Sequence, residues 1–140
     1  MTIRKYYDGI LIVNDAIALI DYADGLHIGQ EDIRAYNGDL AEAVKEIRQK
    51  IGRKQLGLST HNKEEILEAN TLDLDYIGLG AYRATHTKSE ANVGGKALID
   101  VASYSSHPVG MIGGVTLEDD FEEPIRYKVI GSGLYKNSML

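Results

Sequence analysis

Short apolar runs alternate with polar or amphipathic segments along the whole chain, and this pattern predicts strands alternating with helices. Each run is four or five residues long, and glycine or polar residues follow it directly. Continuously apolar runs of this length are typical of strands that are covered on both faces of a parallel sheet. The predicted strands span residues 9–13, 25–28, 55–58, 76–80, 109–112 and 127–130.

Helical patterns separate these runs. Residues 39–51 give the clearest one, because apolar side chains recur there at helical spacing while Glu and Lys occupy the other side. Shorter helices are predicted at residues 16–22 and 97–104. Asn62 followed by Glu65 fits a helix cap with a carboxylate three residues on, which begins a helix that ends near residue 70.

The repeated strand and helix units predict an α/β fold of about six parallel βα units in a single domain, residues 1–140. The net charge of −6 argues against sequence-independent binding of nucleic acid, whose phosphates require a basic face. Cysteine is absent, so disulfides, thiolate metal sites and cysteine nucleophiles are excluded. The sequence has neither an apolar stretch near 18 residues nor a signal-peptide core, so we expect a cytoplasmic protein without a membrane span.

Chemically useful residues follow each predicted strand. Carboxylates follow the early strands, hydroxyls and a lysine follow the middle ones, and glycine turns follow the last two. Because the carboxyl ends of parallel strands lie on one face, these groups are expected to converge there. They are Asn14 and Asp15; Gln30 and Asp32; Ser59 and Thr60; Thr85, Thr87 and Lys88; Gly113 and Gly114; and Gly131 and Ser132.

This set of groups suits a phosphorylated ligand. Threonine hydroxyls and the Lys88 ammonium donate to phosphate oxygens, and glycine turns let backbone N–H groups approach them. Asp15 and Asp32 offer the hard oxygen ligands that Mg²⁺ prefers, usually together with substrate phosphates. The sequence therefore favours a phosphate or pyrophosphate substrate with Mg²⁺.

Each feature also has a purely structural interpretation. Asp15 and Asp32 could cap helices, Ser59 and Thr60 could be turn residues, and the glycines could only form tight turns. His27 alternates within an apolar strand, which favours a hydrogen-bonded interior histidine over a catalytic one. The remaining histidines have no metal-ligand spacing and are assigned no metal; they are His61, His86 and His107.

Five segments together resemble the thiamine phosphate synthase family in order and spacing, from about residue 10 to residue 132. They are Asn14-Asp15, GLHIGQED at 25–32, GLSTH at 57–61, DYIGLGAYRATHTK at 75–88 and IGGV at 112–115. The resemblance implies a TIM-barrel-derived fold. It also implies Mg²⁺-dependent coupling of hydroxymethylpyrimidine pyrophosphate with thiazole phosphate, giving thiamine phosphate and pyrophosphate.

The resemblance also implies residue roles. Asp15 and Asp32 would bind Mg²⁺, and Asn14 would contact pyrophosphate. Ser59 would lie near the pyrimidine and the leaving group, and Lys88 would stabilise the departing pyrophosphate. The expected substrate contacts are Asn14, Gln30, Ser59, Thr85, Thr87, Lys88, Gly113, Gly114, Gly131 and Ser132, with Ser59 and Lys88 as the catalytic residues.

Two departures from the family pattern matter. The family has further strand units at its start, one of which ends in a Gln-Leu-Arg motif followed by Lys, and residues 1–7 match only the helix after it. Six strands cannot close an eight-stranded barrel, so we expect a truncated barrel. Its sheet edges would then be covered by self-association, by closure of a smaller or distorted barrel, or by a complementing chain.

Two alternatives to the synthase remain. A thiazole tautomerase would place a catalytic histidine at the position of Ala81, and His86 lies five positions too late to replace it. A non-catalytic module that binds a phosphorylated ligand is the other alternative. The family's Arg and Lys at the end of the missing strand unit would stabilise charge on pyrophosphate, and loss of one such electrostatic donor commonly removes about 2.7 to 4 kcal/mol of transition-state stabilisation.

Overall fold

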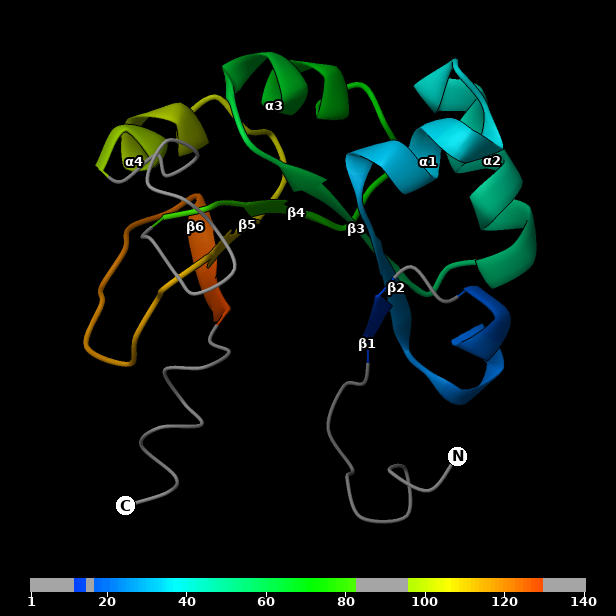
Figure 1. Ribbon diagram of the computed structural model, residues 1–140, viewed down its shortest axis with the longest axis horizontal. Coiled ribbons are helices and arrows are strands. Elements are labelled where there is room, and N and C mark those ends of the chain that lie inside the picture. Colours follow the sequence, from blue (N-terminus) through cyan, green and yellow to red (C-terminus); the bar gives the residue numbers. More distant parts are fainter. Residues whose placement is uncertain (1–11, 15–16, 83–95, 130–140) are drawn as a thin grey trace.

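A curved parallel sheet with helices along its outer side forms the protein (Figure 1). The computed structural model describes residues 12–14, 17–82 and 96–129. Within these residues the sheet has six strands in the order β1-β2-β3-β4-β5-β6, and all neighbours are parallel. The strands are β1 (Ile12–Asn14), β2 (Gly25–Ile28), β3 (Gln55–Thr60), β4 (Tyr76–Leu79), β5 (Val109–Ile112) and β6 (Ile125–Val129).

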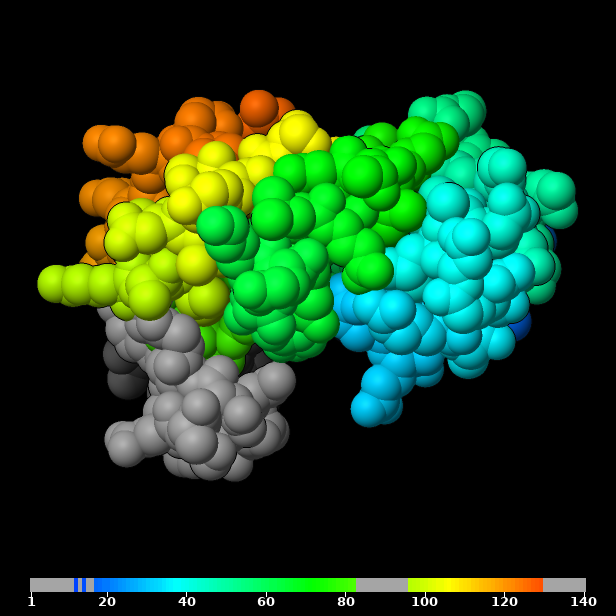
Figure 2. Space-filling model, turned by 90° about the horizontal axis from the view of Figure 1, so that it is seen from above, coloured from blue at the N-terminus to red at the C-terminus, as the bar shows by residue number. Residues whose placement is uncertain are grey.

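Helices connect most neighbouring strands, as parallel pairing requires. The connection from β1 to β2 contains a 3₁₀ helix, whereas two α-helices lie between β2 and β3. Figure 2 shows this helical side, with α1 and α2 beside α3 and α4. The helices are η2 (Ile17–Tyr22), α1 (Gln30–Tyr36), α2 (Leu40–Ile51), α3 (Lys63–Ala69) and α4 (Lys96–Ala102). Among the described residues, no helix is both long and apolar enough to cross a membrane.

The hydrophobic core lies between the sheet and the helices. Alternate strand residues point to this side and are fully buried, while the residues between them face the inner side of the curved sheet. The helices contribute one apolar stripe each. The core includes Leu26, Ile28, Leu56, Leu58, Ile77, Leu79, Val109 and Met111 from the strands, and Ile33, Ala43, Ile47, Ile66, Leu98 and Ala102 from the helices.

The predicted cap at Asn62 is confirmed, and Asp39 also caps a helix. The Asp39 carboxylate accepts a hydrogen bond from the Ala41 N–H at 2.9 Å at the start of α2. The Asn62 side chain accepts from the Glu65 N–H at 2.9 Å at the start of α3, and the Glu65 carboxylate accepts from the His61 N–H at 2.8 Å. These bonds satisfy N–H groups that have no partner inside the helix.

The predicted strands are confirmed, with corrections to several of their ends. β1 includes Asn14, which the sequence interpretation placed after the strand, and β4 ends at Leu79 rather than at residue 80. β3 continues through Ser59 and Thr60, which the sequence interpretation placed in a turn. Thr60 is buried and its hydroxyl donates to the Gly78 carbonyl at 2.8 Å, so this hydroxyl is satisfied inside the sheet. β6 begins at Ile125, because this residue pairs with Val109 directly after Pro124.

Helix α1 was not predicted. It has only seven residues and buries a single side chain, Ile33, so it shows no apolar period. The predicted helix at residues 16–22 forms as the 3₁₀ helix Ile17–Tyr22. Both short elements form because tertiary packing, rather than their own pattern, decides their conformation.

Candidate functional site

The inner side of the sheet holds a cavity of about 600 Å³. Its walls come from all six strands, so the sheet curves enough to bring residues of both edge strands to one hollow. Small or polar residues dominate at its centre, and apolar side chains lie at its flanks. The lining residues are Ile12, Asn14, His27, Gly29, Gln55, Ser59, Tyr76, Gly78, Gly110, Ile112, Tyr127 and Val129.

Two aromatic rings meet inside this cavity over a glycine. His27 on β2 and Tyr76 on β4 both align with Gly57 on the strand between them. A Cβ added to Gly57 would overlap the Tyr76 ring, so only glycine leaves room for it. The rings stack with centroids 5.6 Å apart, and the Tyr76 hydroxyl lies 2.9 Å from His27 Nδ1.

The second ring nitrogen of His27 holds Ser59. The Ser59 hydroxyl lies 2.8 Å from His27 Nε2. Gly78 makes room for the imidazole, since a Cβ at Gly78 would lie 3.0 Å from His27 Cε1. A neutral imidazole has one donor and one acceptor, so donation by Tyr76 leaves His27 Nε2–H to donate to Ser59. In this tautomer the Ser59 hydroxyl keeps its own proton for donation to another group. In the other tautomer Ser59 donates to His27 Nε2, and His27 Nδ1–H donates to Tyr76.

Burial keeps the Tyr76 hydroxyl protonated. Desolvation, together with the nearby Asp75 and Tyr127, raises the pKa of Tyr76 to about 12. The Tyr127 ring packs edge-on against Tyr76, with centroids 6.4 Å apart. Tyr76 therefore stays a neutral hydrogen-bonding partner of His27 throughout the physiological pH range.

Gln30 contacts Ser59 from the other side. Its side-chain Nε2 donates to the Ser59 carbonyl at 2.8 Å, from the first position of α1. Its Oε1 accepts from Arg34 at 3.1 Å. Ser59 is thus held at two points, its hydroxyl by His27 and its carbonyl by Gln30.

Asp32, one of the two predicted Mg²⁺ ligands, lies in the first turn of α1. It is exposed, and its Oδ2 lies 3.9 Å from the position of a Cβ on Gly29. Asp32 is not the N-cap residue of α1, because Gly29 occupies that position. The Asp32 carboxylate lies near the carboxyl end of β2, where oxygen ligands were expected.

The glycine turn after β5 adopts a backbone conformation that favours glycine. Gly113 and Gly114 have φ angles of 93° and 64°. A Cβ on Gly113 would lie 2.8 Å from the Cα of Ala81, so this turn packs closely against the segment after β4. The predicted ends of β4 and β5 therefore come together at the same face as Ser59 and Asp32.

Asn14 ends β1 and lines the cavity, opposite His27 in register. The predicted site residues that lie outside the described residues are Asp15, Thr85, Thr87, Lys88, Gly131 and Ser132.

His27 and Tyr76 are the site residues that the sequence interpretation missed or undervalued. His27 was expected as an interior histidine with satisfied nitrogens, and both its ring nitrogens do have partners, yet it faces the cavity. A signal for these two residues was present in the sequence: neighbouring strands carry glycine at positions that face the inner side of the sheet, Gly57 on β3 and Gly78 on β4. Glycines at such positions leave space that large side chains of the adjacent strands fill.

Comparison with known proteins decides the family. A family model described as thiamine monophosphate synthase matches residues 1–129. The chain belongs to this family.

Two relatives in the thiamine monophosphate synthase family show how much of the chain matches. The chain is 36% identical to the thiamine-phosphate synthase of Persephonella marina over 95% of this chain and 63% of that protein. It is 40% identical to the enzyme of the same name from Methanobrevibacter smithii, over 86% of this chain and 55% of the relative. The chain therefore spans about half the length of such relatives.

A solved structure gives the same result for the fold of this thiamine monophosphate synthase family member. Thiamine phosphate pyrophosphorylase from Pyrococcus furiosus matches with a TM-score of 0.63 and 26% identity, over 82% of this chain and 52% of that chain. The predicted α/β, TIM-barrel-like fold class is confirmed by this match and by the parallel strand order.

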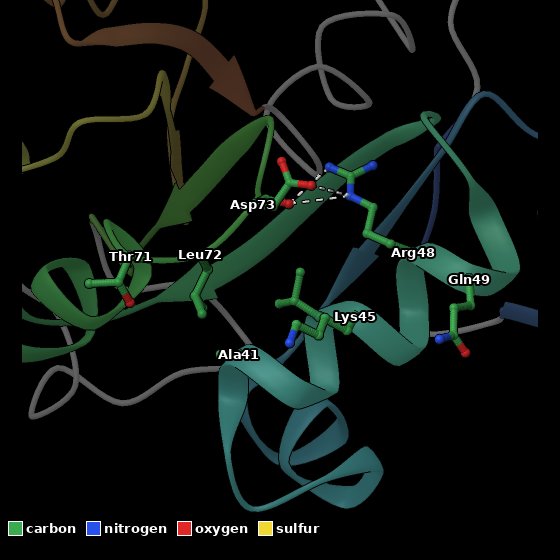
Figure 3. Close-up of a pocket in the computed structure, with 8 residues that line it drawn as sticks. Ala41, Lys45, Arg48, Gln49, Thr71, Leu72 and Asp73 are labelled. Atoms are coloured by element: carbon green, nitrogen blue, oxygen red, sulfur yellow. Dashed lines mark hydrogen bonds and ion pairs between the residues drawn. The ribbon is translucent and has the colours of Figure 1, made fainter.

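A second hollow lies on the helical side of this family member, between α2 and the segment after α3 (Figure 3). Arg48 is its central cation, but this side chain pairs with Asp73 at 3.4 Å and Asp75 at 3.0 Å and donates to three backbone carbonyls. These bonds link α2 to the amino ends of β3 and β4. The bonds of Arg48 in this hollow therefore have a structural role, and the inner cavity is the candidate site.

Proposed function

We propose that the protein acts in thiamine biosynthesis, in the coupling of hydroxymethylpyrimidine pyrophosphate with thiazole phosphate. Family membership supports this proposal, together with relatives that are named thiamine-phosphate synthase. The observation that carries it is the hydrogen bond between the Ser59 hydroxyl and His27 Nε2 at 2.8 Å. Both residues belong to segments that resemble the family, and both line the inner cavity. A cytoplasmic location, where phosphorylated precursors are available, is part of the proposal.

The roles proposed for individual residues follow the chemistry of a departing pyrophosphate. Ser59 would donate to the pyrimidine substrate, and Lys88 would balance the charge that builds on the leaving group. The pyrimidine methylene then becomes cationic, and the thiazole nitrogen attacks it, so that a C–N bond replaces the C–O bond. Phosphate oxygens would be bound by Thr85, Thr87, Gly113, Gly114, Gly131 and Ser132, and by Asn14 at the pyrophosphate.

Mg²⁺ is the proposed cofactor, with Asp15 and Asp32 as its protein ligands. The exposed carboxylate of Asp32 at the end of β2 fits this role, because Mg²⁺ usually binds one or two carboxylates and completes its shell with water and substrate phosphates. When bound, the ion would neutralise charge on the pyrophosphate.

We further propose that another polypeptide segment completes the sheet. Among the described strands, β1 pairs only with β2 and β6 only with β5. Ile12 and Val129 line the cavity from these two strands and are 36% and 39% exposed. A second copy of the chain or a complementing chain would cover them. Light scattering that finds a monodisperse, stably folded and active monomer would remove this part of the proposal.

The tautomerase alternative is weakened by Ala81, which stands where that activity needs a histidine and is buried against Gly113. A module that binds a phosphorylated ligand without turnover is the remaining alternative.

The deciding experiment is an assay for thiamine phosphate with purified protein, with and without Mg²⁺. We expect product only with Mg²⁺, and strong loss of product in Asp32→Asn and Lys88→Ala. Glu31→Gln is the matched control, because Glu31 is also an exposed acid in the first turn of α1. Calorimetry with thiazole phosphate separates the alternatives: binding without product supports the module, and absence of binding contradicts both functions.

A further inference from the structure

The carbonyl of Ser59 lies where β3 extends beyond its neighbour. The last residue of β2 that pairs with β3 is Ile28, opposite Leu58. The Leu56 and Thr60 carbonyls accept from N–H groups on the β4 side, Asp75 and Gly80. Because successive carbonyls of a strand point to opposite sides, the Ser59 carbonyl faces the β2 side, one residue past the last β2 partner.

Gln30 supplies the missing donor. Its Nε2 donates to the Ser59 carbonyl at 2.8 Å in place of a strand N–H. The orientation of the amide follows from its two partners, because a carbonyl only accepts and the Arg34 guanidinium only donates. Arg34 in turn bonds to Glu68 on α3 at 2.9 Å. The side chain of Gln30 is therefore anchored in the helix layer, and it is absent from the residues that line the cavity.

We infer that Gln30 is a positioning residue for the Ser59 hydroxyl, which acts through the Ser59 carbonyl and is supported by Arg34 and Glu68. This inference rests on the proposed function, in which Ser59 donates to the substrate. The carbonyl bond fixes the end of β3, and the direction of the Ser59 Cα–Cβ bond depends on that backbone. The Ser59 hydroxyl then lies 2.8 Å from His27 Nε2.

The test replaces the amide donor by an acceptor of the same size. Gln30→Glu removes the N–H and places a carboxylate against the Ser59 carbonyl. We expect kcat to fall about three- to tenfold, the range for one net hydrogen bond, with KM for both substrates changed less than about twofold. Gln49→Glu, at an exposed position of α2, is the matched control and is expected to leave both constants unchanged.

A readout independent of turnover separates this inference from the proposed function. The ring nitrogens of His27 are observed by ¹⁵N NMR in the protein without substrate. We expect their chemical shifts to change in Gln30→Glu and to stay unchanged in Gln49→Glu. Absence of thiamine phosphate in the parent protein together with these shifts would contradict the proposed function but retain the positioning role.

Two results would overturn the inference. One is an unchanged His27 spectrum with unchanged kcat, and the other is a raised KM with unchanged kcat, which would make Gln30 a substrate contact. If thermal unfolding shows that Gln30→Glu does not fold, Arg34→Met replaces it, since this change frees the Gln30 amide without placing a carboxylate against the Ser59 carbonyl. Arg34→Met must then lower kcat and shift the His27 nitrogen signals, by less than Gln30→Glu would. If kcat and these signals both stay unchanged, the inference is overturned.

Discussion

Gly57 and Tyr76 lie opposite each other on β3 and β4, and the tyrosine ring occupies the space where any other residue at position 57 would carry its side chain. The ring reaches His27 only because of this vacancy. One glycine thus determines whether the hydrogen bonds that join Tyr76, His27 and Ser59 inside the cavity can form.

Gly57→Ala should displace the Tyr76 ring and destabilise the protein by roughly 1–3 kcal/mol, as overpacking of a filled site does. Urea unfolding measures this change. In a Tyr76→Ala background the same substitution should cost less, because the ring is no longer there. Equal costs in both backgrounds would show that the two sites are not coupled.

Arg48→Ala should lower the free energy of unfolding by about 3 kcal/mol, because loss of the mostly buried guanidinium leaves Asp75 without its charged partner and three backbone carbonyls without that donor. Arg53→Ala is the control. Arg53 also pairs with Asp73, at 2.9 Å, but is 75% exposed, so its removal should change stability little. Similar losses for both variants would contradict the structural role assigned to Arg48.

Asn62→Ala should destabilise the protein by about 1 kcal/mol, since the Glu65 N–H at the start of α3 loses its acceptor. Asn62→Asp keeps an oxygen at the same position and should retain most of the stability. Thermal unfolding of the three proteins tests the prediction; a cap role is excluded if both substitutions are equally harmful.

Tyr76 should ionise near pH 12, above the ordinary tyrosine value of 10.0. The folded protein binds this proton more tightly than the unfolded chain, so the contribution to stability is fully present below pH 10 and is lost as the pH rises to about 12. Ultraviolet absorbance should therefore show a late tyrosine titration that Tyr76→Phe removes. Its persistence in that variant would assign it to another tyrosine.

The sequence predicted the sheet well because buried parallel strands leave a strong local signal. The run at residues 109–112 is β5, and that at 25–28 is β2. The helix at Leu40–Ile51 was equally clear, since its five buried side chains recur at helical spacing. Helix α1 was missed, because a short helix with one buried residue has no period to detect.

The candidate site was predicted in part. Ser59 was selected because it follows a predicted strand, and it lines the cavity. Its partners depend on register between strands far apart in sequence, which no local pattern contains. His27 and Tyr76 are 49 residues apart and meet only when β2, β3 and β4 are aligned.

Glycines occupy inward positions on three consecutive strands, Gly57, Gly78 and Gly110, and side chains of neighbouring strands lie over them, Tyr76 over Gly57, His27 over Gly78 and Val129 over Gly110. The shape of the middle of the cavity therefore depends on residues that carry no side chain of their own. Redesign of ligand preference by substitution would have to keep these three glycines and change the side chains at the flanks, such as Asn14 and Tyr127.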